Sequence, residues 1–240
     1  MQLTTREIAE ATGGDALGPP ATSRGATIDS RQVRPGQLFV PIVAERDGHD
    51  FIDAAMAAGA AAHLTTGEAA DGASAVRVAD TSVALTDLGR HARSRLPDQV
   101  VGITGSVGKT SLKDLLAAVG ATTWRTAASA GSFNNELGVP LTLLNAADDT
   151  ELAIVEMGAR GAGHIDVLCA VARPTVGVVT VVAGAHLEQF GSLDDVAHAK
   201  AELVVALPAT GTAVLNADDD RVAAMAGATD AQVVTFGVRG

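Results

Sequence analysis

Cysteine and aromatic side chains are scarce in this 240-residue sequence. Its one cysteine, Cys169, cannot form a disulfide within the chain, which fits a reducing compartment such as the cytoplasm. Tyrosine is absent and aromatic residues make up 2% of the chain, whereas 47% of the residues are hydrophobic. The core is therefore expected to consist of small aliphatic side chains, and Cys169 is expected to pack within it rather than to react.

An excess of positive charge and long apolar runs are also missing. The formal net charge is −11 and the isoelectric point is about 4.8, which argues against nucleic acid or an anionic membrane as partner, because their phosphates would be repelled. No stretch approaches the roughly 18 apolar residues of a membrane span, and the first residues lack a basic segment followed by an apolar one. We expect no signal peptide, no membrane span and a cytoplasmic location.

The length suits one large domain or two modest ones, and we place a boundary at Leu96-Pro-Asp98. This gives an N-terminal domain over residues 1–98 and a second domain over residues 99–240. In the first, Thr4 and Glu7 have the spacing of a helix capping box, and Gly13 is a typical helix stop. The remaining pattern predicts strands in 26–31, 37–43, 60–65 and 75–78, and helices over 51–58 and 80–95.

The second domain alternates apolar strands with helical segments. This alternation predicts an α/β fold with a mostly parallel sheet and right-handed crossovers. The expected strands are 100–104, 151–157, 175–182, 212–216 and 231–236. Ligands of such sheets gather at the carboxyl ends of the strands, so polar residues at those ends are the candidates for function.

The segment Val100 to Ser111 is an apolar strand that runs into a glycine loop and a helix. Such a loop turns backbone N–H groups around a phosphate, with the lysine reaching the outer phosphates and the threonine hydroxyl binding Mg²⁺. The usual G-x-x-x-x-G-K-[ST] spacing is broken, because Ile103 stands where a glycine is expected. The alternative is a glycine-rich turn with a surface lysine. The residues predicted to bind nucleotide are Gly105, Ser106, Val107, Gly108, Lys109, Thr110 and Ser111.

Other polar residues are candidates for function, and most of them also fit an ordinary structural role. Glu156 and His186 follow apolar strands at the edge expected to hold phosphate, where they are candidate Mg²⁺ ligands or ordinary loop residues. The pair Asn134-Asn135 binds a ligand or makes a turn. Further candidates for anions are Ser30 with Arg31, which also fit an Asx-type turn, and Arg160, whereas Lys200 is by default a solvated helix lysine.

Taken together, the segments resemble the Mur ligase family of cell-wall synthesis. The family's phosphate loop has the form T-G-x-x-G-K-T, which accounts for Ile103. The stretches that carry the resemblance span nearly the whole chain in the expected order. They are 28–31, 34–39, 47–51, 103–110, 131–140, 156–160, 185–192 and 199–202.

The resemblance implies an ATP-dependent amide ligase that adds D-alanyl-D-alanine to UDP-N-acetylmuramoyl-tripeptide through an acyl phosphate, in peptidoglycan precursor synthesis. The small N-terminal α/β domain would bind the UDP moiety through Ser30 and Arg31. The phosphate-loop domain would bind ATP and Mg²⁺ through Lys109, Thr110 and Glu156. By the same resemblance, His186 and Lys200 would hold a second Mg²⁺, with the lysine carbamylated by CO₂; the residues near the peptide substrate would be Asn134, Asn135 and Arg160.

One departure from the family matters. The family's middle domain normally continues beyond the segment that corresponds to Thr235-Phe236-Gly237, and a third domain follows. We therefore expect a truncated ligase that does not ligate alone and that exposes an apolar sheet edge. The alternatives are a non-catalytic module that binds a nucleotide or UDP-sugar, and a generic phosphate-loop NTPase or kinase, which has no need of the N-terminal domain.

Overall fold

The structure is a computed structural model that describes residues 1–184 and 190–238. Contacts between Cα atoms divide the chain into two compact units. The first contains Met1–Arg95 with Leu143–Asp148, and the second contains Leu96–Thr142 with Asp149–Gly240. No helix among the described residues is long and apolar enough to cross a membrane.

The first unit is built on a five-stranded sheet in the order β2-β7-β6-β5-β4, where β2 runs antiparallel to β7 and the other neighbours are parallel. A separate antiparallel pair joins β1 to β3. The strands are β1 (Gln2–Thr4), β2 (Asp15–Leu17), β3 (Thr22–Arg24), β4 (Ala26–Thr27), β5 (Leu38–Phe39), β6 (Ala62–Thr65) and β7 (Ala75–Arg77).

Helices of this unit begin where the sequence offers side-chain caps. Helix α1 (Thr5–Thr12) has the predicted capping box between Thr4 and Glu7 and ends at Gly13, which has a left-handed φ of 64°. The other helical segments are η1 (Ser30–Gln32), η2 (Gly48–Phe51), α2 (Ile52–Ala57) and α3 (Thr81–Arg95). The helix predicted over 51–58 is therefore shorter, because Asp47 caps a 3₁₀ turn that precedes it.

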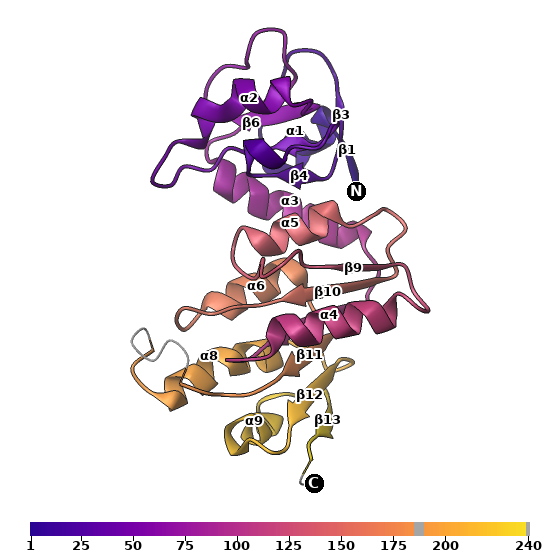
Figure 1. The fold of residues 1–240 in the computed structure, drawn as a ribbon, viewed down its shortest axis with the longest axis vertical. Helices are drawn as coiled ribbons and strands as arrows, with labels where there is room; N and C mark the ends of the chain where they lie inside the picture. Colours follow the sequence, from indigo (N-terminus) through magenta and orange to yellow (C-terminus); the bar gives the residue numbers. More distant parts are fainter. Residues whose placement is uncertain (185–189, 239–240) are drawn as a thin grey trace. The chain divides into compact units, whose positions relative to one another are not determined.

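The second unit contains a six-stranded, wholly parallel sheet in the order β13-β12-β11-β8-β10-β9 (Figure 1). The strands are β8 (Val100–Thr104), β9 (Thr126–Ala128), β10 (Leu152–Glu156), β11 (Val176–Val179), β12 (Thr212–Asn216) and β13 (Gln232–Phe236). The chain moves from β8 to one side of the sheet and then returns to β11 on the other side. The carboxyl ends of β8, β10 and β11 therefore surround the point where the strand order reverses, which is the usual ligand position in such sheets.

Helices cover both faces of this sheet. Helix α4 (Lys109–Gly120) packs Leu112 and Leu116 on Val101 and Ile103 of β8. The intervening residue Gly102 faces the opposite side, where an added Cβ would lie 2.9 Å from Leu203 of helix α8. The helices of this unit are α4, the start of α5 (Gly138–Asn145), α6 (His164–Ala172), α8 (Leu193–Val205), α9 (Asp220–Ala224) and η3 (Met225–Ala228).

The expected exposed apolar sheet edge is present. Among the described strands, β13 pairs with β12 alone, and all five of its residues are exposed to solvent. Val233, Val234 and Phe236 keep 37, 42 and 42% of their surface accessible. Strand β9 on the opposite edge was not predicted, since three residues are too few to show a strand period.

Candidate active site

The glycine loop is shaped by two backbone conformations that favour glycine. Gly105 has a φ of +143°, and a Cβ there would lie 1.8 Å from the Thr180 hydroxyl oxygen. Gly108, with a φ of +87°, starts helix α4. The Ser106 hydroxyl bonds the backbone of Ala183, and Thr180 donates to the carbonyl of Val107, so the end of β11 fixes this loop. The loop thus has the form that a phosphate requires.

Lys109 and Thr110 extend from the first turn of α4 toward the neighbouring strand end. The Lys109 amine donates to the carbonyl oxygen of Gly105 at 2.7 Å. Burial lowers the pKa of Lys109 below its usual 10.5, and the charge of Glu156 partly opposes this. The Thr110 hydroxyl donates to Oε2 of Glu156 at 2.9 Å, whereas Ser111 is exposed on the same turn.

Glu156 ends strand β10 and is only 1% exposed. Its second carboxylate oxygen, Oε1, accepts a hydrogen bond from the Asn134 side-chain amide at 2.8 Å. Its backbone N–H donates to the Ser129 hydroxyl at 3.1 Å. A buried carboxylate is costly unless hydrogen bonds satisfy it, and here both oxygens accept one.

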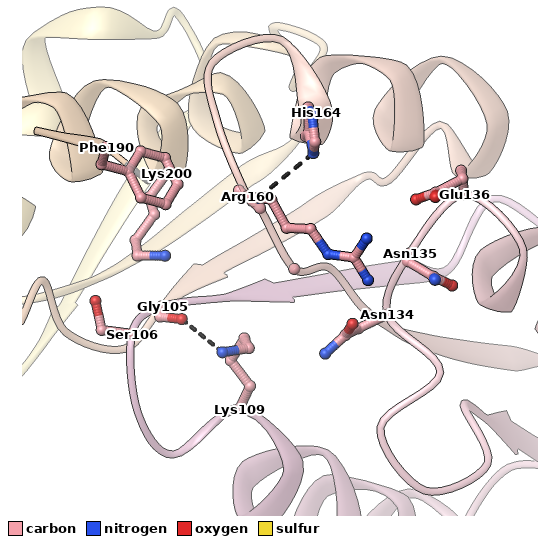
Figure 2. Close-up of a pocket in the computed structure, with 12 residues that line it drawn as sticks. Gly105, Ser106, Lys109, Asn134, Asn135, Glu136, Arg160, His164, Phe190 and Lys200 are labelled. Carbon is pink, nitrogen blue, oxygen red and sulfur yellow. Dashed lines mark hydrogen bonds between the residues drawn. The ribbon is translucent and has the colours of Figure 1, made fainter. Parts of the chain in front are cut away.

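A pocket of about 160 Å³ lies beside Lys109 and Asn134 and reaches helix α8 and the loop after β10. Figure 2 shows the amines of Lys109 and Lys200 directed into this pocket, with Arg160 extending toward the asparagine pair. The lining residues are Gly105, Ser106, Lys109, Asn134, Asn135, Glu136, Gly158, Ala159, Arg160, His164, Phe190 and Lys200. His186 lies outside the described residues.

Lys200 is buried in the pocket wall at 5% exposure, not solvated as a helix lysine ordinarily is. Burial and then the charge of Lys109 lower the pKa of Lys200 from 10.5 to about 8. No residue that the structure describes gives Lys200 a hydrogen bond or an ion pair. At neutral pH its amine is therefore neutral in a larger fraction of molecules than the amine of an exposed lysine.

The two asparagines, Asn134 and Asn135, make hydrogen bonds to different parts of the site. Asn134 holds Glu156, and its backbone carbonyl accepts from Gly158 at 2.7 Å. Asn135 accepts from the backbone of Gly138 at the start of α5. The structure thus brings both into the pocket wall, but with side-chain bonds that the spacing did not predict.

A second cavity, of about 450 Å³, lies within the first unit. Ser30 and Arg31 line it, together with Phe39, Phe51 and Arg46, which the sequence did not single out. The Arg31 guanidinium binds both oxygens of Asp29 at 2.9 and 2.8 Å and lowers the pKa of Asp29 to about 2. Asp29 also caps η1, so the predicted Asx-type turn and the proposed anion site coincide.

Several residues that shape the pocket were missed at the sequence level. Thr180 lies just past β11, inside the longer strand predicted over 175–182, so the strand end that would have drawn attention to it was misplaced. His164 accepts a long hydrogen bond from the backbone of Arg160 at 3.4 Å. Phe190 gives no sequence signal, because a single aromatic residue has many uses.

Comparison with known proteins agrees with this arrangement. Residues 103–240 match the Mur ligase middle domain, and residues 22–92 match the Mur ligase family, catalytic domain. The chain is 38% identical over 221 residues to the UDP-N-acetylmuramoyl-tripeptide–D-alanyl-D-alanine ligase of Escherichia coli, covering 92% of this chain and 49% of that protein.

Solved structures give the same result. MurF from Acinetobacter baumannii superposes with a TM-score of 0.88 at 29% identity, over 99% of this chain and 54% of that one. MurF from Thermotoga maritima, solved in complex with ADP, superposes at 0.78 with 32% identity, over 91% and 51%. The chain spans about half the length of the curated relatives it matches. Because the middle-domain match alone covers more than half of its residues, the chain belongs to the Mur ligase family.

Proposed function

We propose that this chain carries the nucleotide and UDP-substrate sites of an ATP-dependent ligase that adds D-alanyl-D-alanine to UDP-N-acetylmuramoyl-tripeptide. Residues 1–98 form the UDP-substrate domain and residues 99–240 the ATP-binding domain. The reaction belongs to peptidoglycan precursor synthesis and takes place in the cytoplasm, where ATP is available. The observation that carries the proposal is the convergence of Lys109, the Thr110–Glu156 pair and Lys200 at one edge of the parallel sheet.

The phosphates of ATP bind over the glycine loop. Backbone N–H groups from Val107 to Ser111 surround them, while the N–H of Ser106 donates to the carbonyl of Val181 and holds the loop. Lys109 adds a positive charge beside the outer phosphate. The hydrogen bond between Lys109 and the Gly105 carbonyl is then exchanged for one to the ligand. Because the loop is already fixed by Thr180 and Ser106, it binds without much reordering.

Mg²⁺ fits the residues present. A hydroxyl and a buried carboxylate are oxygen ligands of the kind Mg²⁺ prefers, and it usually takes only one or two carboxylates together with phosphate oxygens and water. Thr110 and Glu156 would hold it, with a second ion at Lys200 and His186. Bound Mg²⁺ supplies positive charge beside the phosphate oxygens. In the described part of the chain no three His, Cys, Asp or Glu side chains cluster as a metal site.

The chemistry is transfer of a phosphoryl group followed by amide formation. A carboxylate oxygen of the tripeptide forms a bond to the γ-phosphorus, and the bond to the β–γ bridging oxygen breaks, which releases ADP. The amine of D-alanyl-D-alanine then bonds the acyl carbon, loses a proton and displaces phosphate. Lys109 stabilises the negative charge of the transferred group, and Arg160 and Asn135 orient the peptide carboxylate.

Lys200 is proposed to react with CO₂. Its neutral amine nitrogen bonds the carbon of CO₂ and releases one proton, which gives a carbamate with the ligand properties of a carboxylate. The pKa of about 8 supports this step, because only the neutral amine carries the free electron pair. Phe190 lines the same pocket as this amine and supplies an apolar surface beside it.

Two titrations with crossed controls test the proposal. The chain is titrated with ATP plus Mg²⁺ and, separately, with UDP-N-acetylmuramoyl-tripeptide. We expect Lys109→Ala to abolish ATP binding and to leave the UDP substrate bound, whereas Ser30→Ala with Arg31→Ala does the reverse. Absence of binding of both ligands to the unmodified chain would overturn the proposal. Addition of D-alanyl-D-alanine then tests for ADP release.

A further inference from the structure

Lysine is used sparingly in this chain. Only three of its 17 basic residues are lysines, at positions 109, 113 and 200. Two of them line the pocket, and the third, Lys113, lies one turn beyond Lys109 on helix α4. The Lys113 side chain is only 3% exposed, and the proposed reaction gives it no task.

The Lys113 ammonium makes two hydrogen bonds and one ion pair. It donates to the backbone carbonyls of Ser129 and Gly131, each at 2.8 Å, and lies 3.0 Å from a carboxylate oxygen of Asp114. Two of its three N–H donors are bonded to carbonyls, and the carboxylate adds an opposite charge, which together offset the cost of burying the ammonium. The planar guanidinium of an arginine presents its donors in a different, fixed geometry.

The two carbonyls belong to the start of the loop that carries Asn134. Ser129 is fixed on its other sides as well, because its N–H donates to Ile154 and its hydroxyl accepts from the backbone of Glu156. Five residues later, Asn134 donates to the Glu156 carboxylate at 2.8 Å. A continuous set of hydrogen bonds therefore joins Lys113 to the carboxylate that faces Thr110.

We propose that Lys113 is a positioning residue for the metal–nucleotide site. It holds the loop from Ser129 to Asn134 in place, so that Asn134 keeps one oxygen of Glu156 and leaves the other directed at Thr110. This inference rests on the proposed function, since its readout is nucleotide binding. A lysine that only stabilises helix α4 would leave the orientation of Glu156, and hence metal affinity, unchanged.

The test measures ATP affinity by calorimetry with and without Mg²⁺ in Lys113→Met, Asn134→Ala and the double variant. Loss of a group that orients a metal ligand typically costs 10- to 100-fold in metal affinity, so the Mg²⁺-dependent gain in ATP affinity should fall about tenfold in Lys113→Met. ATP affinity without Mg²⁺ should stay the same. Because both residues act through Glu156, the double variant should lose no more than Asn134→Ala alone.

Asp114→Asn is the matched control. It removes the negative charge of an exposed partner but leaves both carbonyl bonds, so Mg²⁺-dependent binding should stay at the level of the unmodified chain. Hydrogen exchange supplies a second readout, in which amides of 129–135 exchange faster in Lys113→Met while those of β12 do not change. If Lys113→Met does not fold, Lys113→Arg takes its place. The same loss of Mg²⁺-dependent ATP affinity is expected, because arginine keeps the positive charge but not the hydrogen-bond geometry of the lysine ammonium.

The outcomes separate this inference from the function on which it rests. Failure of the unmodified chain to bind ATP contradicts the proposed function. Normal binding with an unchanged Mg²⁺ dependence in Lys113→Met contradicts the role of Lys113 alone. A loss in the double variant that equals the sum of the two single losses also overturns it, since independent effects would then account for the data.

Discussion

Replacing Lys200 by methionine is expected to stabilise the protein at neutral pH. The side chain is 5% exposed, and its pKa falls from 10.5 to about 8, first because of burial and then because of Lys109. At about 1.4 kcal/mol per pH unit, this fall corresponds to about 3 kcal/mol by which folding disfavours the protonated amine. Methionine has a similar length and no charge, so Lys200→Met removes that cost.

The pH dependence identifies the cause. Below pH 8 both the folded and the unfolded chain protonate Lys200, and the folded state bears the full cost. Between about pH 8 and pH 10.5 the unfolded chain binds more protons than the folded chain. The free energy of unfolding of the wild type therefore rises with pH relative to that of Lys200→Met. The advantage of Lys200→Met should thus be about 3 kcal/mol at pH 7 and approach zero near pH 10.5.

Urea unfolding followed by circular dichroism, in buffers free of CO₂, measures this difference. Arg6→Met is the control, because Arg6 is a cation whose side chain is 87% exposed, and its loss should leave the free energy of unfolding nearly unchanged. Equal or lower stability of Lys200→Met at pH 7 would refute the reasoning. So would a gain that stays constant from pH 7 to pH 10.

Two further substitutions test how the pocket is built. Gly105→Ala should abolish ATP binding, because its Cβ would lie 1.8 Å from the Thr180 hydroxyl oxygen. At Gly108 an added Cβ meets open space, so Gly108→Ala should cost only the roughly 1–2 kcal/mol of a left-handed backbone. Calorimetry measures ATP binding in the two variants, and thermal unfolding measures their stability. Glu202→Gln should destabilise helix α6 by about 1 kcal/mol, because the Glu202 carboxylate accepts from the backbone of Gly163 and Asp166 at the positive end of that helix. Hydrogen exchange of α6 measures this, and unchanged exchange would contradict the assigned cap.

The regular parts of the fold could be predicted from local patterns. Helix α1 was confirmed because the capping box between Thr4 and Glu7 is local to its own helix end, and strand β8 because its apolar run is unbroken before the glycine loop. The short strands β1, β2, β3 and β9 were not found. Each has three residues, and their pairing depends on partners distant in the sequence.

The candidate site was predictable only in part, for a related reason. The glycine loop can be recognised from its glycine-rich composition, and Glu156 from its place at the end of an apolar strand. Lys113 has none, because its burial depends on carbonyls that approach from 16 and 18 residues away. The depressed pKa of Lys200 likewise depends on burial and on Lys109, which no spacing within one helix reveals.

The most direct test of the central claim is the effect of Mg²⁺ on ATP affinity in the wild type and in Glu156→Gln. The glutamine keeps the size of the side chain and one carbonyl oxygen but removes the charge that Mg²⁺ requires. The account predicts that Mg²⁺ tightens ATP binding at least about tenfold in the wild type and has little effect in Glu156→Gln. The same tightening in both proteins would contradict the assignment of Thr110 and Glu156 as the metal–nucleotide site.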